Sequence, residues 1–153
     1  MKKFRYKMES LLQIKFKLED QAKIAYGNAR IRLSMEEEKL AHLNIKNETY
    51  ENELRHLRSD VLDLFKIKQC EQAIDVLKTI IKQQKTVVKN AEHRLEISRI
   101  RLQNAMVDRK TQEKLKEKAF EEYILDFNSE ESKEVDERNS FHYSDPAFHE
   151  EDI

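Results

Sequence analysis

The sequence predicts an all-α protein built from a long coiled coil, and three observations lead to this prediction. The 153 residues include one Gly and one Pro, too few for the tight turns of a sheet or for a glycine-rich phosphate loop. Hydrophobic and charged residues each make up 39% of the chain, so apolar side chains can line one stripe of a helix but cannot fill a globular core. Apolar residues also recur in alternating steps of three and four, the 3.5-residue repeat of a helix that winds around a partner.

The first helix is predicted to start near residue 4 and to run to about residue 64. Three positions of its seam, Lys15, Glu36 and Asn47, break the apolar rule. Two consecutive steps of four end at Ala29 and Leu33, which predicts a stutter where the supercoil locally unwinds. The seam positions are Phe4, Met8, Leu11, Lys15, Leu18, Ala22, Ala25, Ala29, Leu33, Glu36, Leu40, Leu43, Asn47, Tyr50, Leu54, Leu57, Val61 and Leu64.

A second helix is predicted from a similar series that begins at residue 70. Only Gln84 and Ser98 interrupt its apolar character. Beyond Ala105 the repeat becomes unclear, and apolar residues return between Leu115 and Tyr123. The seam positions are Cys70, Ile74, Leu77, Ile81, Gln84, Val88, Ala91, Leu95, Ser98, Leu102 and Ala105.

The boundary between the two helices is predicted at residues 58–64. Leu64 and Cys70 are six residues apart, which breaks the repeat; Ser59 and Asp60 are good N-cap residues, and Asp63 would favour the first turn of the second helix. If the chain folds back at about residue 62, residues whose numbers sum to about 124 face each other, and small side chains between 22 and 29 meet large ones between 95 and 102. On these residues alone, one unbroken helix with an irregular repeat remains the alternative.

We therefore expect residues 1–138 to form the coiled coil and residues 139–153 to form a disordered acidic tail, which contains the only Pro. The charge is distributed as a gradient. Residues 1–30 contain eight basic and three acidic side chains, whereas residues 130–153 contain two basic and nine acidic ones. Because the net charge of the whole chain is −1, no overall basic character points to a nucleic acid.

Neither catalysis nor a cofactor is expected. Two paired helices offer no concave, partly dry pocket, the five His form no HxxxH pair, and one Cys leaves no zinc-ligand spacing. Cys70 is expected to be a buried small apolar residue, and a lone Cys permits no internal disulfide and indicates a reducing compartment. No apolar run of signal-peptide or membrane-span length is found, so we expect a protein of the cytoplasm.

Near the predicted turn, the apolar side chains are more numerous than one seam can bury. They either close the end of the hairpin as a hydrophobic plug or form a docking patch for a partner. These side chains are Val61, Leu62, Leu64, Phe65 and Ile67.

Three segments carry a family resemblance. Residues 4–23 (FRYKMESLLQIKFKLEDQAK) combine an aromatic–basic–aromatic start, a Leu–Leu pair and a charged helix. Residues 64–80 (LFKIKQCEQAIDVLKTI) begin the second helix, with Cys70 at a place that is often aromatic, and residues 109–137 end in an acidic run, EESKEVDE. In this order and spacing, the segments resemble the flagellar FliJ family, the small coiled-coil component of the type III flagellar export apparatus.

The resemblance implies an antiparallel two-helix coiled-coil hairpin that turns near residue 60. It also implies a non-catalytic stalk, similar to the central stalk of rotary ATPases, whose paired ends enter the ring of the flagellar export ATPase. The body of the stalk would reach towards the export-gate membrane protein, and the family is implicated in handling export chaperones. Such a protein would lie in the cytoplasm, peripheral to the inner face of the cell membrane at the flagellar base.

Two binding surfaces are hypothesised from this resemblance. Basic residues at one end of the hairpin would meet acidic loops of the ATPase ring, and these are Lys2, Lys3, Arg5, Lys7, Arg109, Lys110, Lys114, Lys116 and Lys118. The turn and the adjoining face would bind the export gate through Leu62, Phe65, Ile67 and Ile74.

Three other functions remain open: a generic coiled-coil scaffold, the stalk of a virulence-type secretion system, and a prefoldin-like chaperone arm that grips clients with Phe4, Tyr6 and Phe120. A nucleic-acid-binding protein is disfavoured, because basic and acidic residues alternate outside the two ends of the chain.

Overall fold

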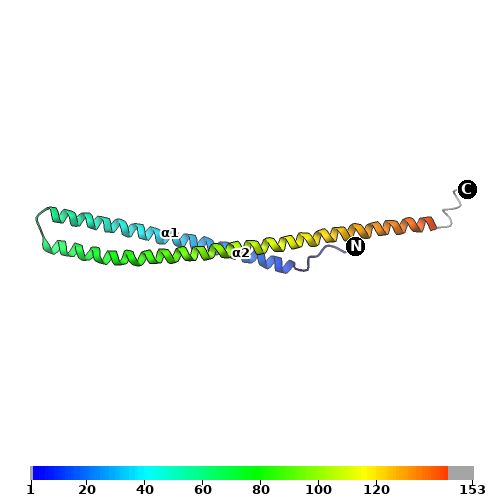
Figure 1. Cartoon of the computed structure of the whole chain (residues 1–153), viewed down its shortest axis with the longest axis horizontal. Coiled ribbons are helices and arrows are strands. Elements are labelled where there is room, and N and C mark those ends of the chain that lie inside the picture. The colour runs from blue at the N-terminus through cyan, green and yellow to red at the C-terminus, as the bar shows by residue number, and fades with distance from the viewer. Residues whose placement is uncertain (1, 145–153) are drawn as a thin grey trace. The chain divides into compact units, whose positions relative to one another are not determined.

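The computed structural model describes residues 2–144, and the expectation of a disordered tail over residues 145–153 lies outside the described residues. Two helices account for nearly all of the described chain: α1, Glu9–Ser59, and α2, Leu64–Ser144 (Figure 1). Residues 60–63 connect them, inside the range 58–64 that the sequence indicates. The all-α prediction is thereby confirmed.

The chain divides into two compact units, which are described separately. The hairpin unit comprises Leu18–Met106, and the terminal unit comprises the described parts of Met1–Lys17 and Val107–Ile153. Each unit therefore contains a segment from each half of the chain.

In the hairpin unit, α2 folds back antiparallel along α1, as predicted (Figure 1). The Gln84 amide donates hydrogen bonds to the backbone oxygen of Glu36 at 3.0 Å and to its carboxylate at 2.6 Å. Nearer the turn, the Cys70 thiol donates to the backbone oxygen of Tyr50 at 3.4 Å. The numbers of the paired residues sum to 120 in both cases, close to the expected 124. The apolar core is Ile74, Leu77, Ile81, Val88 and Ala91.

The inward stripe of α1 is an unbroken heptad repeat, which corrects the predicted stutter between Ala29 and Leu33. The prediction followed the apolar residues Leu18 and Ala25, but both are exposed. Leu18 is 45% exposed, whereas its neighbour Glu19 is 4% exposed. The buried and half-buried positions advance in alternating steps of three and four: Leu12, Lys15, Glu19, Ala22, Tyr26, Ala29, Leu33, Glu36, Leu40, Leu43, Asn47, Tyr50, Leu54 and Leu57.

On α2, every seam position predicted between Cys70 and Ala105 is buried or half-buried. The same repeat continues through the stretch where the sequence pattern is unclear. Its half-buried positions there are Arg109, Gln112, Lys116, Ala119 and Tyr123. The apolar pattern fades in this stretch because polar side chains occupy the inward positions, not because the helix changes its register.

The turn is defined by two aspartates. The Asp63 carboxylate accepts hydrogen bonds from the backbone N–H groups of Phe65 (3.1 Å) and Lys66 (3.3 Å), the geometry of an N-cap. Asp60 instead accepts from the N–H of its neighbour Val61 at 2.9 Å. The cap of α2 is therefore Asp63, whereas the sequence favoured Ser59 and Asp60.

Two further differences from the prediction appear, one at the turn and one at the far end of α2. Val61 and Leu64, expected on the seam, are 89% and 75% exposed, because they lie outside the paired part of the helices. At the other end, α2 continues to Ser144, past residue 138 where the coiled coil was expected to end. Residues 128–143 of this helix are exposed along their whole length.

Candidate protein-interaction surfaces

In the terminal unit, residues 2–7 lie against the part of α2 that contains Phe120 and Tyr123. The ring of Phe4 meets that of Phe120 edge-on at 5.2 Å between centroids and that of Tyr123 at 5.4 Å. The Tyr123 hydroxyl donates a hydrogen bond to the backbone oxygen of Lys2 at 2.8 Å. These contacts hold the segment before α1 in place, although it has no helical hydrogen bonds of its own.

Ion pairs hold the start of α1 to the same part of α2. Lys116 lies 2.8 Å from the Glu9 carboxylate, and Lys15 lies 3.7 Å from that of Asp108. The hydrogen bond from Lys116, helped by one from Gln13, lowers the pKa of Glu9 below its ordinary value. Glu9 therefore remains ionised and paired at neutral pH.

Arg109 is held by contacts within the terminal unit. Its guanidinium lies 5.8 Å from the centre of the Phe16 ring, and it forms a 2.8 Å ion pair with Glu113. The side chain is 18% exposed. A guanidinium stacked on an aromatic face and paired with a carboxylate contributes to packing here.

The predicted basic residues of segments 2–7 and 109–118 both lie in the terminal unit. Arg109 and Lys116 face inward and are used in the contacts described above. The exposed members, which we call the basic surface, are Lys2, Lys3, Arg5, Lys7, Lys110, Lys114 and Lys118. Residues 2–7, together with Ala119, Glu122, Tyr123 and Asp126, also line a hollow of about 850 Å³.

The apolar residues of the turn are exposed and do not form a plug. Leu62 is 65% exposed and Phe65 is 73% exposed, alongside Val61 and Leu64. We call these four residues the turn patch. Ile67 is half-buried, and Ile74, hypothesised from the sequence as a contact residue, is only 5% exposed and belongs to the core.

The contact of the Phe4 ring with the rings of Phe120 and Tyr123 in the terminal unit was not predicted from the sequence. A signal for it was present, because Phe4 and Phe120 have numbers that sum to 124, the value expected for facing residues. The seam itself gave no hint, since Phe120 is not a seam position on α2 and is 47% exposed.

The described part of the chain contains one free cysteine, Cys70. Its His, Cys, Asp and Glu side chains form no group of three that could hold a metal ion. Burial raises the pKa of the Cys70 thiol above its ordinary value, and the nearby Glu53 and Glu71 act in the same direction, so the thiol stays protonated. Among the described helices, none combines the length and apolar character that a membrane span requires.

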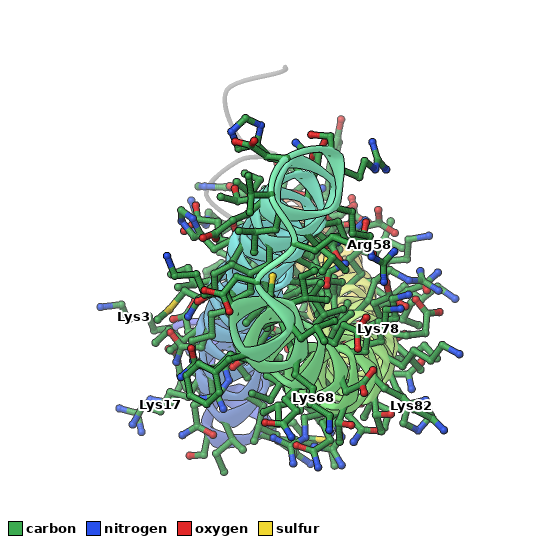
Figure 2. All side chains as sticks on the ribbon, turned by 90° about the vertical axis from the view of Figure 1, so that its left-hand side faces the viewer. Lys3, Lys17, Arg58, Lys68, Lys78 and Lys82 are labelled. Atoms are coloured by element: carbon green, nitrogen blue, oxygen red, sulfur yellow. The ribbon has the colours of Figure 1, made fainter. Side chains whose placement is uncertain are left out.

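Charged side chains cover the outside of the hairpin unit. Seen from the turn, Lys68, Lys78 and Lys82 of α2 project away from the ribbon (Figure 2). These side chains are exposed. These three lysines belong to the hairpin unit and are not part of the basic surface.

The chain is similar to known proteins both in sequence family and in fold. The family described as flagellar FliJ protein matches residues 4–147. No curated protein sequence matches the chain. Among solved structures, the YscO homolog CT670 from Chlamydia trachomatis is similar, with a TM-score of 0.74 and 22% sequence identity, and the match covers 99% of this chain and 100% of that one. At this identity the structural likeness shows the fold.

Proposed function

Because this chain belongs to the family of flagellar FliJ proteins, we propose that it is a non-catalytic stalk component of the type III flagellar export apparatus. The observation that carries the proposal is the family match over residues 4–147, nearly the whole chain. The antiparallel pairing of α1 and α2 supports it, since a stalk needs stiff paired helices and no reaction pocket.

We further propose that the basic surface binds acidic loops inside the ring of the flagellar export ATPase. Its seven cationic side chains are exposed, while Arg109 and Lys116 keep the underlying segments together. Attraction between exposed charges of opposite sign speeds association and weakens as salt screens it. Binding to the ATPase should therefore depend on ionic strength.

Charge reversal tests this contact. We expect Lys114→Glu with Lys118→Glu to weaken stimulation of the export ATPase by about tenfold in the concentration required, because two attractive charges become repulsive. The matched control is Lys78→Glu with Lys82→Glu, an exposed lysine pair on α2 within the hairpin unit. Steady-state ATP hydrolysis at several salt concentrations measures the effect. Unchanged stimulation by the Lys114/Lys118 variant would count against this contact.

The turn patch is proposed to bind the export-gate membrane protein. Four neighbouring exposed apolar side chains are unusual on a soluble helical hairpin and commonly mark a partner site. Leu62→Ala with Phe65→Ala should abolish capture of the gate protein's cytoplasmic part but leave the helical circular dichroism signal intact. Ile45→Ala, which also removes an exposed apolar side chain, is the control. Loss of helicity in the double variant would mean that the patch is part of the core.

Two finer roles complete the proposal. We propose that the protein also handles export chaperones, and that it is peripheral to the inner face of the cell membrane at the flagellar base. Pull-down with purified export chaperones tests the first role. A fluorescent fusion tests the second: it should form spots at flagellar bases, and a uniformly diffuse signal in cells with assembled flagella would contradict this location.

A further inference from the structure

The inward face of α2 continues beyond the residues that cover it in the terminal unit. On this face, the Tyr123 ring lies 5.4 Å from that of Phe4, and Phe127 is half-buried. Further steps of three and four along the helix reach three exposed carboxylates, which we call the acidic row: Glu130, Glu134 and Glu137. Because most helix stability in proteins comes from packing against another element, a partner that covers this exposed stretch would stabilise it.

The charge of this stretch indicates what kind of partner fits. Residues 128–139 contain five acidic and two basic side chains, a net charge of −3. The two basic residues, Lys133 and Arg138, lie beside the acidic row and not within it. Like charges four residues apart on a helix repel each other, so cations supplied by a partner would relieve this repulsion.

The segment before α1 presents a matching row of cations. Phe4 and Tyr6 are half-buried on the side that faces α2, where the Tyr6 hydroxyl donates a hydrogen bond to the side-chain oxygen of Gln112 at 3.5 Å. The residues that alternate with them are exposed, and we call them the cationic row: Lys3, Arg5 and Lys7. Because neighbouring side chains of an extended segment point to opposite sides, this row faces away from α2 of its own chain.

The two rows match in length and in number of charges. Glu130 and Glu137 are seven residues apart on a helix, about 10 Å. Lys3 and Lys7 are four residues apart in a segment without helical hydrogen bonds, at most about 14 Å. Each copy of the chain carries one acidic and one cationic row, so two copies related by a two-fold axis can form the same contact twice.

We propose that two copies of this chain associate through their terminal units, with the acidic row of each copy against the cationic row of the other. A nucleic acid or an anionic membrane would cover the cationic row alone, whereas a second copy covers both rows. This inference goes beyond the proposed stalk function and does not depend on it. The contact would also cover part of the basic surface, so association with a second copy and binding to the ATPase should compete.

Sedimentation equilibrium of the full chain tests the proposal. At low ionic strength the original chain should form dimers as its concentration rises, and added NaCl should dissociate them, because exposed ion pairs are weak and screened by salt. Glu130→Lys with Glu134→Lys should raise the dimer Kd by at least about tenfold, and so should Lys3→Glu with Arg5→Glu. An equimolar mixture of these two variants should return the Kd to within about twofold of the original, because each reversed row then meets an opposite charge.

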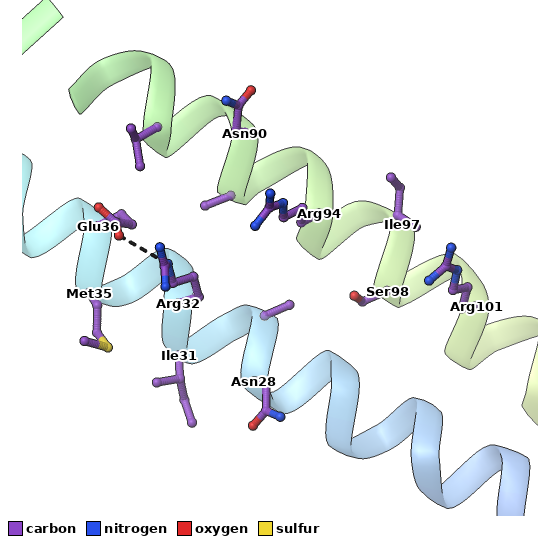
Figure 3. A pocket seen from close by; sticks show the side chains of 13 residues that line it. Asn28, Ile31, Arg32, Met35, Glu36, Asn90, Arg94, Ile97, Ser98 and Arg101 are labelled. Atoms are coloured by element: carbon purple, nitrogen blue, oxygen red, sulfur yellow. Dashed lines mark ion pairs between the residues drawn. The ribbon is translucent and has the colours of Figure 1, made fainter. Parts of the chain in front are cut away.

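Two control variants carry the same charge changes in the hairpin unit. Arg94→Glu with Arg101→Glu reverses two exposed arginines of α2 that lie outside the proposed contact (Figure 3). Glu37→Lys with Glu38→Lys reverses two exposed carboxylates of α1. Both controls should leave the dimer Kd within about twofold of the original. Circular dichroism checks that each variant keeps its helical signal; if the Glu130/Glu134 variant does not, Glu130→Gln with Glu134→Gln replaces it, with a smaller rise in Kd expected.

Several outcomes would overturn the proposal. A chain that stays monomeric at low ionic strength would have no such contact, and equal weakening by controls and row variants would reveal general attraction between charges. A mixture that fails to recover would mean that the two rows do not meet. Tighter binding of a DNA duplex or of anionic lipid vesicles, dependent on Lys3 and Arg5, would assign the cationic row to phosphate groups.

Discussion

Glu36 shows how one polar residue can occupy the seam of a two-helix pair. Its side chain is nearly buried, but Gln84 donates to it from α2, and Arg32 and Lys39 lie at 3.2 and 3.7 Å on α1. The hydrogen bond from Gln84 is the main reason why the pKa of Glu36 is lowered, and the two cations contribute less. A polar pair that reaches across a seam favours one register of the helices over its neighbours, because a shifted register leaves the carboxylate unpaired.

The lowered pKa predicts how stability changes with pH. A carboxyl whose pKa is lower in the folded state stabilises the fold above its ordinary pKa of 4.5, and this contribution is lost as the pH falls through the folded-state value. The Tm of the original chain should therefore exceed that of Glu36→Gln at pH 7, and the difference should shrink towards pH 3. Thermal melts followed by circular dichroism measure it. Glu38→Gln, an exposed carboxyl on the same helix, is the control; a pH-independent difference at Glu36 would contradict the argument.

Adjacent residues on α2 provide a second test at the scale of one side chain. Leu77 is 4% exposed, whereas Val76 is 61% exposed. Leu77→Ala should lower the free energy of unfolding by about 2–3 kcal/mol, the lower part of the range for buried Leu, because a two-helix core surrounds each side chain incompletely. Val76→Ala should change it by less than about 0.5 kcal/mol. Urea denaturation measures both variants, and equal effects would mean that the seam on α2 is misplaced.

At the scale of an element, the start of α2 depends on one cap. Asp63 accepts two backbone N–H groups of the first turn, whereas Asp60 accepts one from its neighbour. Asp63→Ala should cost about 1 kcal/mol in the free energy of unfolding, and Asp60→Ala should cost less than about 0.5 kcal/mol. Urea denaturation at pH 7 distinguishes them, and the reverse order would move the cap to the position favoured from the sequence.

The two helices also differ in how far their pattern could be followed in the sequence. Apolar residues mark the α2 seam from Cys70 to Ala105, and the structure follows it position by position. After Ala105 the inward positions are Arg109, Gln112 and Lys116, whose long stems pack while their polar heads find partners in their own helix, on α1 or in the segment before α1. A hydrophobicity pattern cannot detect such positions, because their side chains also contact Phe16, Tyr6 and Glu9, which are far away in the sequence.

At the scale of the whole molecule, the division into two units predicts that each responds separately to change. Phe4→Ala removes the ring contacts with Phe120 and Tyr123 that hold residues 2–7. Aromatic pairs contribute about 0.5–1.5 kcal/mol each, so trypsin cleavage after Lys7 should become about tenfold faster. Hydrogen exchange of the core residues 74–91 in the hairpin unit should not change. Phe65→Ala, which removes an exposed ring at the turn, is the control.

Two results would contradict this picture. Faster exchange of residues 74–91 in the Phe4→Ala variant would mean that both units open together. Unchanged trypsin cleavage would mean that the rings do not hold the segment before α1.

Several properties of this protein followed from the sequence by itself: the all-α class, the seam of α2 and the placement of the basic residues of segments 2–7 and 109–118 in one unit. The family resemblance then favoured the fold-back near residue 62 over one unbroken helix. Periodicity and charge are local properties, and a chain with one Gly and one Pro has few other folds available. Only the tertiary structure decided that Glu19 and Tyr26 face inward where Leu18 and Ala25 were expected, that Asp63 caps α2, and that the turn patch is exposed. Between residues 15 and 29 the two possible seams of α1 share Lys15, Ala22 and Ala29 and differ by one residue at two positions, so contact with α2 selects between them.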